Sequence, residues 1–452
     1  MDYLNTEETI VALSTPYGEG AIAIIRVTGR DAIDIVSKIY SGPIKTYRSH
    51  TAHFGSILNA DDSILDNVLI LVMKAPNSYT SEDIVEIHCH GSLLITKKIL
   101  ERILSSGARA ALAGEFTFRA FHHKKIDLIQ AEAVKDLIHA KNELALKFAS
   151  SQLAGNLSQK VEKMQDSLTD IASFFEASLD FPEEDNFGTK NNHITSLEKI
   201  LDELKAIIAT FDNGEKLSHD FSLCILGSPN VGKSTLMNLL VGKPKAIVTP
   251  IAGTTRDILE ETITFGKLSF RLIDTAGIRN TKKTIEKEGV KRAKEAFKKA
   301  DFVLLMLDGT RPLNAVDKQL LDEVDDSKTV IIWNKIDIKT PKVKLPNQHV
   351  VFISAKNETN LSDLTKTIEH MILKNTLPST DGIVITNVRH KKCLQEAYDY
   401  GEKALLALKN NFALEMIIVD IKAALNSLSN IIGQDITENI LDRIFSQFCI
   451  GK

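Results

Sequence analysis

The stretch "FSLCILGSPNVGKST" (221–235) constrains the fold of this chain more than any other. Its apolar start is typical of a buried strand, and the glycines of the G-x-x-x-x-G-K-S pattern that follows let backbone N–H groups approach phosphate oxygens. The helix expected next adds positive potential at its N-terminus. Strand, loop and helix in this order predict a P-loop nucleotide-binding domain.

Three more motifs follow, each at the end of an expected strand. They are Asp274-Thr-Ala-Gly277, Asn334-Lys-Ile-Asp337 and Ser354-Ala-Lys356. An aspartate at 337 can accept hydrogen bonds from the guanine N1–H and 2-amino group, a pair that adenine lacks. Because such ligand sites form where parallel strands end, the motifs predict a doubly wound, mainly parallel sheet that binds GTP.

Several side chains of these motifs have expected roles. Lys233 would reach the β- and γ-phosphates, Ser234 would bind Mg²⁺, and Thr255 would join it when a γ-phosphate is present. Ile278 follows the Asp-Thr-Ala-Gly motif, where many small GTPases have a glutamine that orients water. An apolar side chain cannot orient water, so the hydrolytic machinery must lie elsewhere.

Composition limits the protein class. The chain has 452 residues, 43% of them apolar, and a net charge of −4, which argues against general binding to polyanions. Cys89, Cys224, Cys393 and Cys449 show no paired spacing, as expected in a reducing compartment. With no signal-peptide pattern and no apolar run near the ~20 residues that span a bilayer, we expect a cytoplasmic protein without membrane contact.

The character of the sequence changes three times. We expect an N-terminal α+β domain at 1–119 and helical segments at 120–216 and 379–452. The GTPase domain, expected at 217–378, would then be inserted into a single discontinuous helical domain. The expected fold class is therefore α/β combined with α.

The stretch "EDIVEIHCHG" (82–91) places polar side chains in an apolar strand pattern. Glu86 interrupts an apolar strand, so its carboxylate needs a partner. His88 and His90 share a strand face, but two histidines without a second ligand cluster make a poor zinc site, and we interpret them as pocket or core residues.

The sequence ends in a helical pattern followed by "CIGK". Asp435 and Glu438 look like a capping box, after which apolar residues recur at four-residue spacing: Ile436, Ile440, Ile444 and Phe448. This stripe predicts that the helix docks and that the residues after it are held. Cys449 is then either an ordinary buried thiol or part of a site.

Several of these motifs occur together in one known family. "GSPNVGKS", "TPIAGTTRD", "DTAGIR" and "CIGK", with "STPYGEGAIAIIRVTG" and "APNSYTSEDIVEIHCHG", resemble the MnmE (also called TrmE) family of tRNA-modification GTPases. The resemblance spans essentially the whole chain.

The resemblance implies how the GTPase works. K⁺ would supply the charge that other GTPases take from an arginine finger, with Asn230, Thr249, Ile251 and Thr254 as ligands, while the G domains of two subunits pair across their nucleotides. Glu286 falls where the family has its water-positioning glutamate, although a glutamate among lysines is also typical of a solvated helix face. The residues expected at the nucleotide are Asn230, Val231, Gly232, Lys233, Ser234, Thr235, Thr249, Pro250, Ile251, Ala252, Gly253, Thr254, Thr255, Asp274, Thr275, Ala276, Gly277, Asn334, Lys335, Asp337, Ser354, Ala355 and Lys356.

The resemblance also implies a second site and partners. A 5-formyltetrahydrofolate pocket would be formed by Arg26, Glu86, Lys125 and Lys452, and Cys449 would serve the modification chemistry. The N-terminal domain would form a homodimer, and the FAD-dependent MnmG would complete a heterotetramer acting on tRNA.

The predicted function is a K⁺-dependent GTPase that, with MnmG, adds a carboxymethylaminomethyl-type group to C5 of wobble uridine, using a folate-carried one-carbon unit. A rival hypothesis is an RNA-binding GTPase switch in ribosome assembly or signalling that modifies nothing. Folate binding separates the two, because the rival has no use for the pocket.

Overall fold

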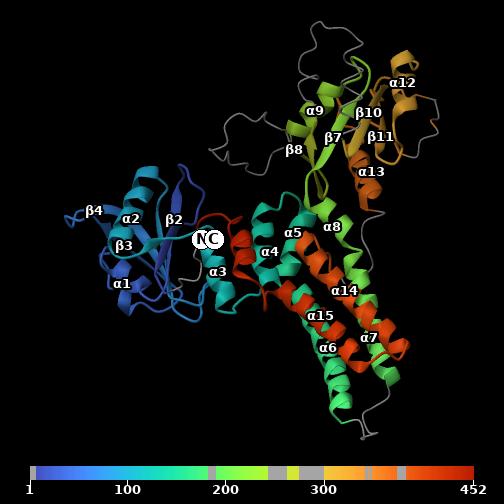
Figure 1. The fold of residues 1–452 in the computed structure, drawn as a ribbon. Helices are drawn as coiled ribbons and strands as arrows, with labels where there is room; N and C mark the ends of the chain where they lie inside the picture. The colour runs from blue at the N-terminus through green and yellow to red at the C-terminus, as the bar shows by residue number, and fades with distance from the viewer. Residues whose placement is uncertain are drawn as a thin grey trace.

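The computed structural model describes residues 7–181, 190–242, 262–273, 300–341, 345, 349–373 and 383–452. Figure 1 shows an N-terminal sheet on one side of a bundle of helices and a second sheet at one end of the bundle. Among the described helices, none is both long and apolar enough to span a membrane.

The N-terminal part is a six-stranded sheet with the order β3-β4-β5-β2-β1-β6, antiparallel except for the β1–β6 pair. Its strands are β1 (Ile10–Leu13), β2 (Ile22–Thr28), β3 (Thr51–Leu58), β4 (Ile64–Met73), β5 (Ile84–His90) and β6 (Arg109–Ala110). Its helices are α1 (Ala32–Ser37), η1 (Ile44–Thr46), α2 (Leu93–Ser105) and α3 (Glu115–His122). Alternate residues of β4, such as Val68, Ile70 and Val72, are buried, as a sheet with one packed face requires.

The helical part is built from two distant segments of the chain. Its helices are α4 (Leu128–His139), α5 (Glu143–Leu153), α6 (Asn156–Asp180), α7 (Lys190–Ile208), α8 (Phe211–Ser218), α14 (Val388–Lys409), α15 (Leu414–Ile432) and α16 (Glu438–Phe445). Val161 and Leu197 from the first segment share one buried core with Leu394 and Ile431 from the second. In Figure 1 the green and red helices accordingly lie side by side.

The second sheet has the order β12-β11-β10-β7-β9-β8, and only β8 and β9 pair antiparallel. Its strands are β7 (Phe221–Leu226), β8 (Thr262–Phe265), β9 (Leu268–Leu272), β10 (Phe302–Asp308), β11 (Thr329–Asn334) and β12 (Val350–Phe352), and its described helices are α9 (Lys233–Gly242), α12 (Ala315–Glu323) and α13 (Leu361–Leu373). Ile225 of β7 packs in one buried cluster, whereas Cys224 packs in another. The sheet is thus covered on both faces, and the predicted fold class is confirmed.

The element ends differ from the expected divisions of the chain. The expected boundaries at 119/120 and 216/217 fall inside α3 and α8, because a helical pattern continues across each junction. The third, at 378/379, lies outside the described residues. The division into domains remains a prediction.

The last helix docks through most of the predicted stripe, because Ile436, Ile444 and Phe448 pack in one apolar cluster, but two expected details are wrong. Thr437, not Asp435, is the N-cap of α16, and no side chain caps it. Phe445 and Phe448 are buried beside Phe118, whereas Ile440 is 43% exposed. A strict four-residue spacing advances by about 40° per step around a helix of 3.6 residues per turn, so the stripe does not stay on one face and Ile440 points away from the contact.

Candidate functional site

The phosphate loop depends on two glycines. Gly227 and Gly232 have φ values of +144° and +104°, and both are closely packed. A Cβ atom on Gly227 would lie 2.3 Å from the carbonyl oxygen of Met306, and one on Gly232 would lie 2.2 Å from Nδ2 of Asn334. No larger residue fits without moving the loop, because both the conformation and the space exclude it.

Lys233 begins α9 and turns back over the loop. Its ammonium group donates to the carbonyl oxygens of Gly227 at 2.7 Å and Ser228 at 2.8 Å. Burial lowers the pKa of Lys233, and the negative charge of Asp317 opposes that shift. Ser234 and Thr235 follow on the exposed first turn of α9, where their hydroxyl oxygens are ligands of the kind that Mg²⁺ prefers.

Asn334 joins three loops at the other end of the site. Its buried side chain donates from Nδ2 to the carbonyl oxygen of Val231 at 2.8 Å and accepts at Oδ1 from the backbone N–H of Ala355 at 2.9 Å. The Ser354 hydroxyl donates to Oδ1 of Asp337 at 2.6 Å, which leaves that exposed carboxylate oriented. This arrangement can hold phosphates at one end and a base with paired donors at the other.

Two neighbouring residues complete this end of the site. The Lys335 ammonium donates to Oδ2 of Asp308 at 2.6 Å, and Lys356 is exposed.

At the phosphate end, Asn230 is exposed on the phosphate loop with a φ of 61°.

Part of the predicted site lies outside the described residues. This holds for Thr249, Pro250, Ile251, Ala252, Gly253, Thr254 and Thr255, for Asp274, Thr275, Ala276 and Gly277, and for Glu286.

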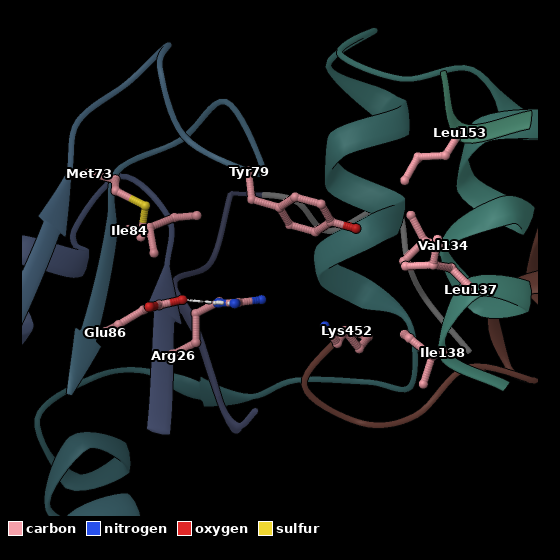
Figure 2. A pocket seen from close by; sticks show the side chains of 10 residues that line it. All are labelled: Arg26, Met73, Tyr79, Ile84, Glu86, Val134, Leu137, Ile138, Leu153 and Lys452. Carbon is pink, nitrogen blue, oxygen red and sulfur yellow. Dashed lines mark hydrogen bonds and ion pairs between the residues drawn. The ribbon is translucent and has the colours of Figure 1, made fainter. Parts of the chain in front are cut away.

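A second site is a cavity of about 310 Å³ between the N-terminal sheet and the helical part (Figure 2). Its lining consists of Arg26, Met73, Tyr79, Ile84, Glu86, Val134, Leu137, Ile138, Leu153 and Lys452. Figure 2 shows Arg26 and Glu86 facing the side chains of α4 and α5 across the cavity. The sheet side therefore combines the charged pair with Met73 and Ile84, whereas α4 and α5 form an apolar wall.

Arg26 and Glu86 form the polar part of the sheet side. They lie opposite each other on β2 and β5, and Oε1 of Glu86 accepts from Nε of Arg26 at 2.9 Å and lies 2.8 Å from its Nη2. The guanidinium carbon lies 5.8 Å from the ring centre of Tyr79 and 5.7 Å from that of Phe116. Glu86 thus has the partner that its sequence position required.

The residues after α16 deliver Lys452 to this cavity. Gly451 has a φ of +93°, and a Cβ atom there would lie 2.2 Å from the carbonyl oxygen of Leu13. The Ser14 hydroxyl donates to the Gly451 carbonyl oxygen at 3.3 Å, and Ile450 forms a β-bridge with Ala113. The tail is held by backbone contacts that need a glycine next to Lys452.

Charge also shapes this corner of the cavity. Burial and the nearby Arg26 lower the pKa of Lys452, whereas Glu86 and Cys449 act in the opposite direction. Two cations therefore share one carboxylate, an arrangement suited to a ligand that brings negative charge.

Two predicted residues lie outside the cavity lining. Lys125 is exposed, and its ammonium donates to the carbonyl oxygen of Ser78, next to Tyr79. The thiol of Cys449 is exposed, while its carbonyl oxygen accepts from the backbone N–H of Gly114 at 3.4 Å.

The two histidines of β5 have carboxylate neighbours. Nδ1 of His90 lies 2.7 Å from Oδ1 of Asp66, and Nε2 of His88 lies 3.4 Å from Oε2 of Glu86. Within the described ranges, no group of three or more His, Cys, Asp or Glu side chains is placed to hold a metal ion.

Sequence reasoning missed the apolar wall and Tyr79. Val134, Leu137 and Ile138 of α4 and Leu153 of α5 belong to ordinary amphipathic helices, so no local pattern marks them. Tyr79 lies in a loop, where its hydroxyl group pairs with that of Thr117 at 2.9 Å.

Known proteins share both parts of the chain. The family model described as "GTP-binding protein TrmE N-terminus" matches residues 9–125, and the one described as "MnmE helical domain" matches residues 128–449. A protein named tRNA modification GTPase MnmE from Protochlamydia amoebophila is 47% identical over 98% of this chain and 98% of its own length. Relatives of the same name from Lachnoclostridium phytofermentans and Clostridioides difficile are 41% and 40% identical, over 98% and 99% of this chain and 99% of each relative.

These matches run across the phosphate loop, the guanine-binding motifs and the cavity alike. The chain therefore belongs to the MnmE family, and it is a GTP hydrolase of tRNA modification that uses GTP and Mg²⁺.

Proposed function

We propose that this GTPase acts in the cytoplasm and, together with the FAD-dependent MnmG, adds a carboxymethylaminomethyl-type group to C5 of wobble uridine in certain tRNAs. A 5-formyltetrahydrofolate or a related one-carbon folate occupies the cavity between the sheet and α4. The observation that carries this proposal is the Arg26–Glu86 pair facing Lys452 across an apolar-walled cavity. A carboxylate suits the amide and amine donors of a pterin, and the cations suit the carboxylates of a folate tail.

Folate binding is tested directly by calorimetry with 5-formyltetrahydrofolate. Replacing Glu86 with Gln removes the charged acceptor, so we expect affinity to fall at least about tenfold, since hydrogen bonds to charged groups contribute ~1.5–3 kcal/mol. Asp61→Asn, at an exposed carboxylate in the turn between β3 and β4, is the control and should bind normally. Absence of binding by the unaltered protein would refute the folate proposal.

The proposed cycle of GTP hydrolysis depends on K⁺. Asn230, Thr249, Ile251 and Thr254 would bind the ion, and Glu286 would position the attacking water. Support comes from Asn230, which is exposed at the phosphate loop. K⁺ offsets the charge that develops between the β- and γ-phosphates.

We expect hydrolysis to be much faster in KCl than in NaCl at equal ionic strength. Asn230→Ala should lose that difference and retain the slow rate. Equal rates of the unaltered protein in the two salts would exclude this role of K⁺.

Mg²⁺ would be held by Ser234 and, once GTP is bound, by Thr255. When bound, the ion neutralises charge on the phosphates. Ser234→Ala should weaken Mg²⁺-dependent nucleotide binding, measured by titrating Mg²⁺ at fixed GDP.

A homodimer through the outer face of the N-terminal sheet is supported by its exposed apolar residues. Phe54 is 71% exposed and lies opposite Leu69, which is 49% exposed. Ile22, at 64% exposed, lies on the same face, as do Arg26 and Glu86. A second copy of the chain would bury this face beside the cavity.

Replacing Phe54 with Lys should shift the protein toward monomer in sedimentation experiments. An unchanged dimer would place the interface elsewhere, and a monomeric unaltered protein would refute the homodimer. MnmG would then join the dimer to form the heterotetramer.

Cys449 and Lys125 have narrower proposed roles. The exposed Cys449 thiol serves the modification chemistry, and Lys125 binds the folate after releasing the Ser78 carbonyl. Cys449→Ser should abolish modification of tRNA while GTP hydrolysis continues, which analysis of tRNA nucleosides would reveal.

A further inference from the structure

A hydrogen bond fixes the phosphate loop to a helix outside the four GTP motifs. The hydroxyl of Ser228, the residue after Gly227, donates to Oδ1 of Asp317 at 2.5 Å. Both residues are only 1% exposed. Asp317 lies in the first turn of α12, and the motif leaves the identity of residue 228 open.

The second oxygen of Asp317 is held just as firmly. Oδ2 accepts from Nη1 of Arg311 at 2.7 Å and from the backbone N–H of Asn314 at 3.0 Å, the latter as part of a capping box. Burial opposes ionisation of Asp317, but the bonds from Ser228, Asn314 and Arg311 outweigh it, so the pKa of this carboxyl is lowered. The carboxylate is a fixed, charged anchor at the end of a capped helix.

Ser228 connects this anchor with the phosphate-binding lysine. Its side chain binds Asp317, while its own carbonyl oxygen accepts from Nζ of Lys233. Asp317 therefore fixes the backbone segment on which Lys233 rests.

The same contacts extend toward the guanine end. Nε of Arg311 lies 4.0 Å from Oδ2 of Asp308, which accepts from Nζ of Lys335. This route is separate from the direct bond between Asn334 and Val231.

We propose that Asp317 is a positioning residue for GTP, which holds Ser228 and the first half of the phosphate loop in the binding geometry before the nucleotide arrives. Without this bond the loop occupies other conformations in the free protein. The apparent Kd then rises in proportion as the binding-competent fraction falls. Bound nucleotide restores the geometry, so the rate of hydrolysis at saturation is affected little.

The test uses Ser228→Ala in the full chain, with Kd measured by calorimetry for GDP and for a non-hydrolysable GTP analogue. We expect both Kd values and the KM for GTP to rise about tenfold. In Ser228→Ala the binding-competent loop leaves Oδ1 of Asp317 without the Ser228 hydroxyl, and losing a hydrogen bond to a buried charged acceptor disfavours that conformation by at least about tenfold. The kcat at saturating GTP should stay within about twofold of the unaltered protein. This split between KM and kcat would not follow from a general loss of stability.

Ser222→Ala is a matched control. The Ser222 hydroxyl donates to Oδ2 of Asp301 at 2.5 Å at the opposite end of β7, so the same kind of bond is lost in the same domain. Its Kd values should remain within about twofold of normal. Equal shifts in Ser228→Ala and Ser222→Ala, or no shift in Ser228→Ala, would overturn the proposal.

If Ser228→Ala does not fold, a second pair of variants tests the same bond from the side of its acceptor. Asp317→Asn should raise the Kd values more than Asp301→Asn, and equal values would contradict the role of Asp317. The double variant Ser228→Ala/Asp317→Asn should weaken binding by less than the sum of the two single losses, because both substitutions remove the same Ser228–Asp317 bond. Additive losses would count against the proposal.

Discussion

Arg389 forms a bidentate ion pair with the carboxylate of Glu132 across the helical core. Nε of Arg389 donates to Oε1 at 2.9 Å and Nη2 to Oε2 at 2.6 Å, although the residues lie 257 positions apart. Nε2 of His390 lies 2.7 Å from Oε2 of the same carboxylate. This cluster joins α4, three of whose residues line the cavity, to the start of α14, where the chain returns from the second sheet.

Removing the carboxylate should therefore destabilise the helical part strongly. Glu132→Ala leaves the Arg389 guanidinium with two backbone carbonyl acceptors but no carboxylate, and breaking a buried ion pair in this way costs about 3–5 kcal/mol. Urea unfolding followed by circular dichroism measures the loss. As a control, Asp212→Ala breaks an exposed pair with Lys391 on the same helix and should cost less than about 1 kcal/mol.

Acid should weaken the same cluster. Although burial opposes ionisation, His390 and Arg389 lower the pKa of Glu132 from its ordinary value of 4.5 to about 2. Because the folded pKa lies below the unfolded one, the stabilisation is present above pH 4.5 and disappears as pH falls toward 2. Unfolding free energies measured over this range should fall more steeply for the unaltered protein than for Glu132→Gln, and parallel slopes would contradict the assignment.

Gly451 should be intolerant of any side chain. Gly451→Ala places Cβ against the Leu13 carbonyl oxygen and forces alanine into a left-handed conformation, so the tail should release from β1. Hydrogen exchange of residues 446–452 should then become faster. Gly107→Ala is the control, because Gly107 also has a positive φ, +116°, but open space around its Cβ; its tail should exchange at the normal rate.

Asp337 should determine the choice of base. In Asp337→Asn the side chain can no longer accept both guanine donors, so GTP affinity should fall by a hundredfold or more, on the order of 3 kcal/mol. Xanthosine triphosphate presents a carbonyl where guanine has its amino group, and its affinity should rise. Competition binding with the two nucleotides measures the exchange, and unchanged preference would remove Asp337 from the base site.

The nucleotide loops were predictable because their signals are local. An apolar run that ends in Gly227 already indicates a strand followed by a phosphate loop, and the same logic located Asn334. The need of Glu86 for a partner could also be predicted, because a carboxylate in an apolar strand is costly alone. That the partner is Arg26 depends on the register of β2 with β5.

The remaining features depend on contacts between distant segments. Asp317 looks like an ordinary helix-cap residue until the fold places it beside Ser228. Val134 and Leu137 look like core residues until the N-terminal sheet faces them. The exposure of Ile440 has a simpler cause, since the rotation of a short helix is set by the residues that pack, here Phe445 together with Leu441 and Ile444.

The two-segment helical core sets an order of events during synthesis. Val161, Leu168 and Phe175 of α6 leave the ribosome long before their partner helix α15, because the segment that forms the second sheet lies between them in the chain. The second sheet has two buried clusters, one of which also includes Leu144 and Phe148 of α5, and all of these residues precede α14, so this part can fold in that interval. Until Ile431 and the rest of α15 are synthesised, α6 lacks this partner and part of its apolar face stays exposed to solvent. Synthesis therefore passes through a stage in which the second sheet can already be folded while the helical core is still incomplete.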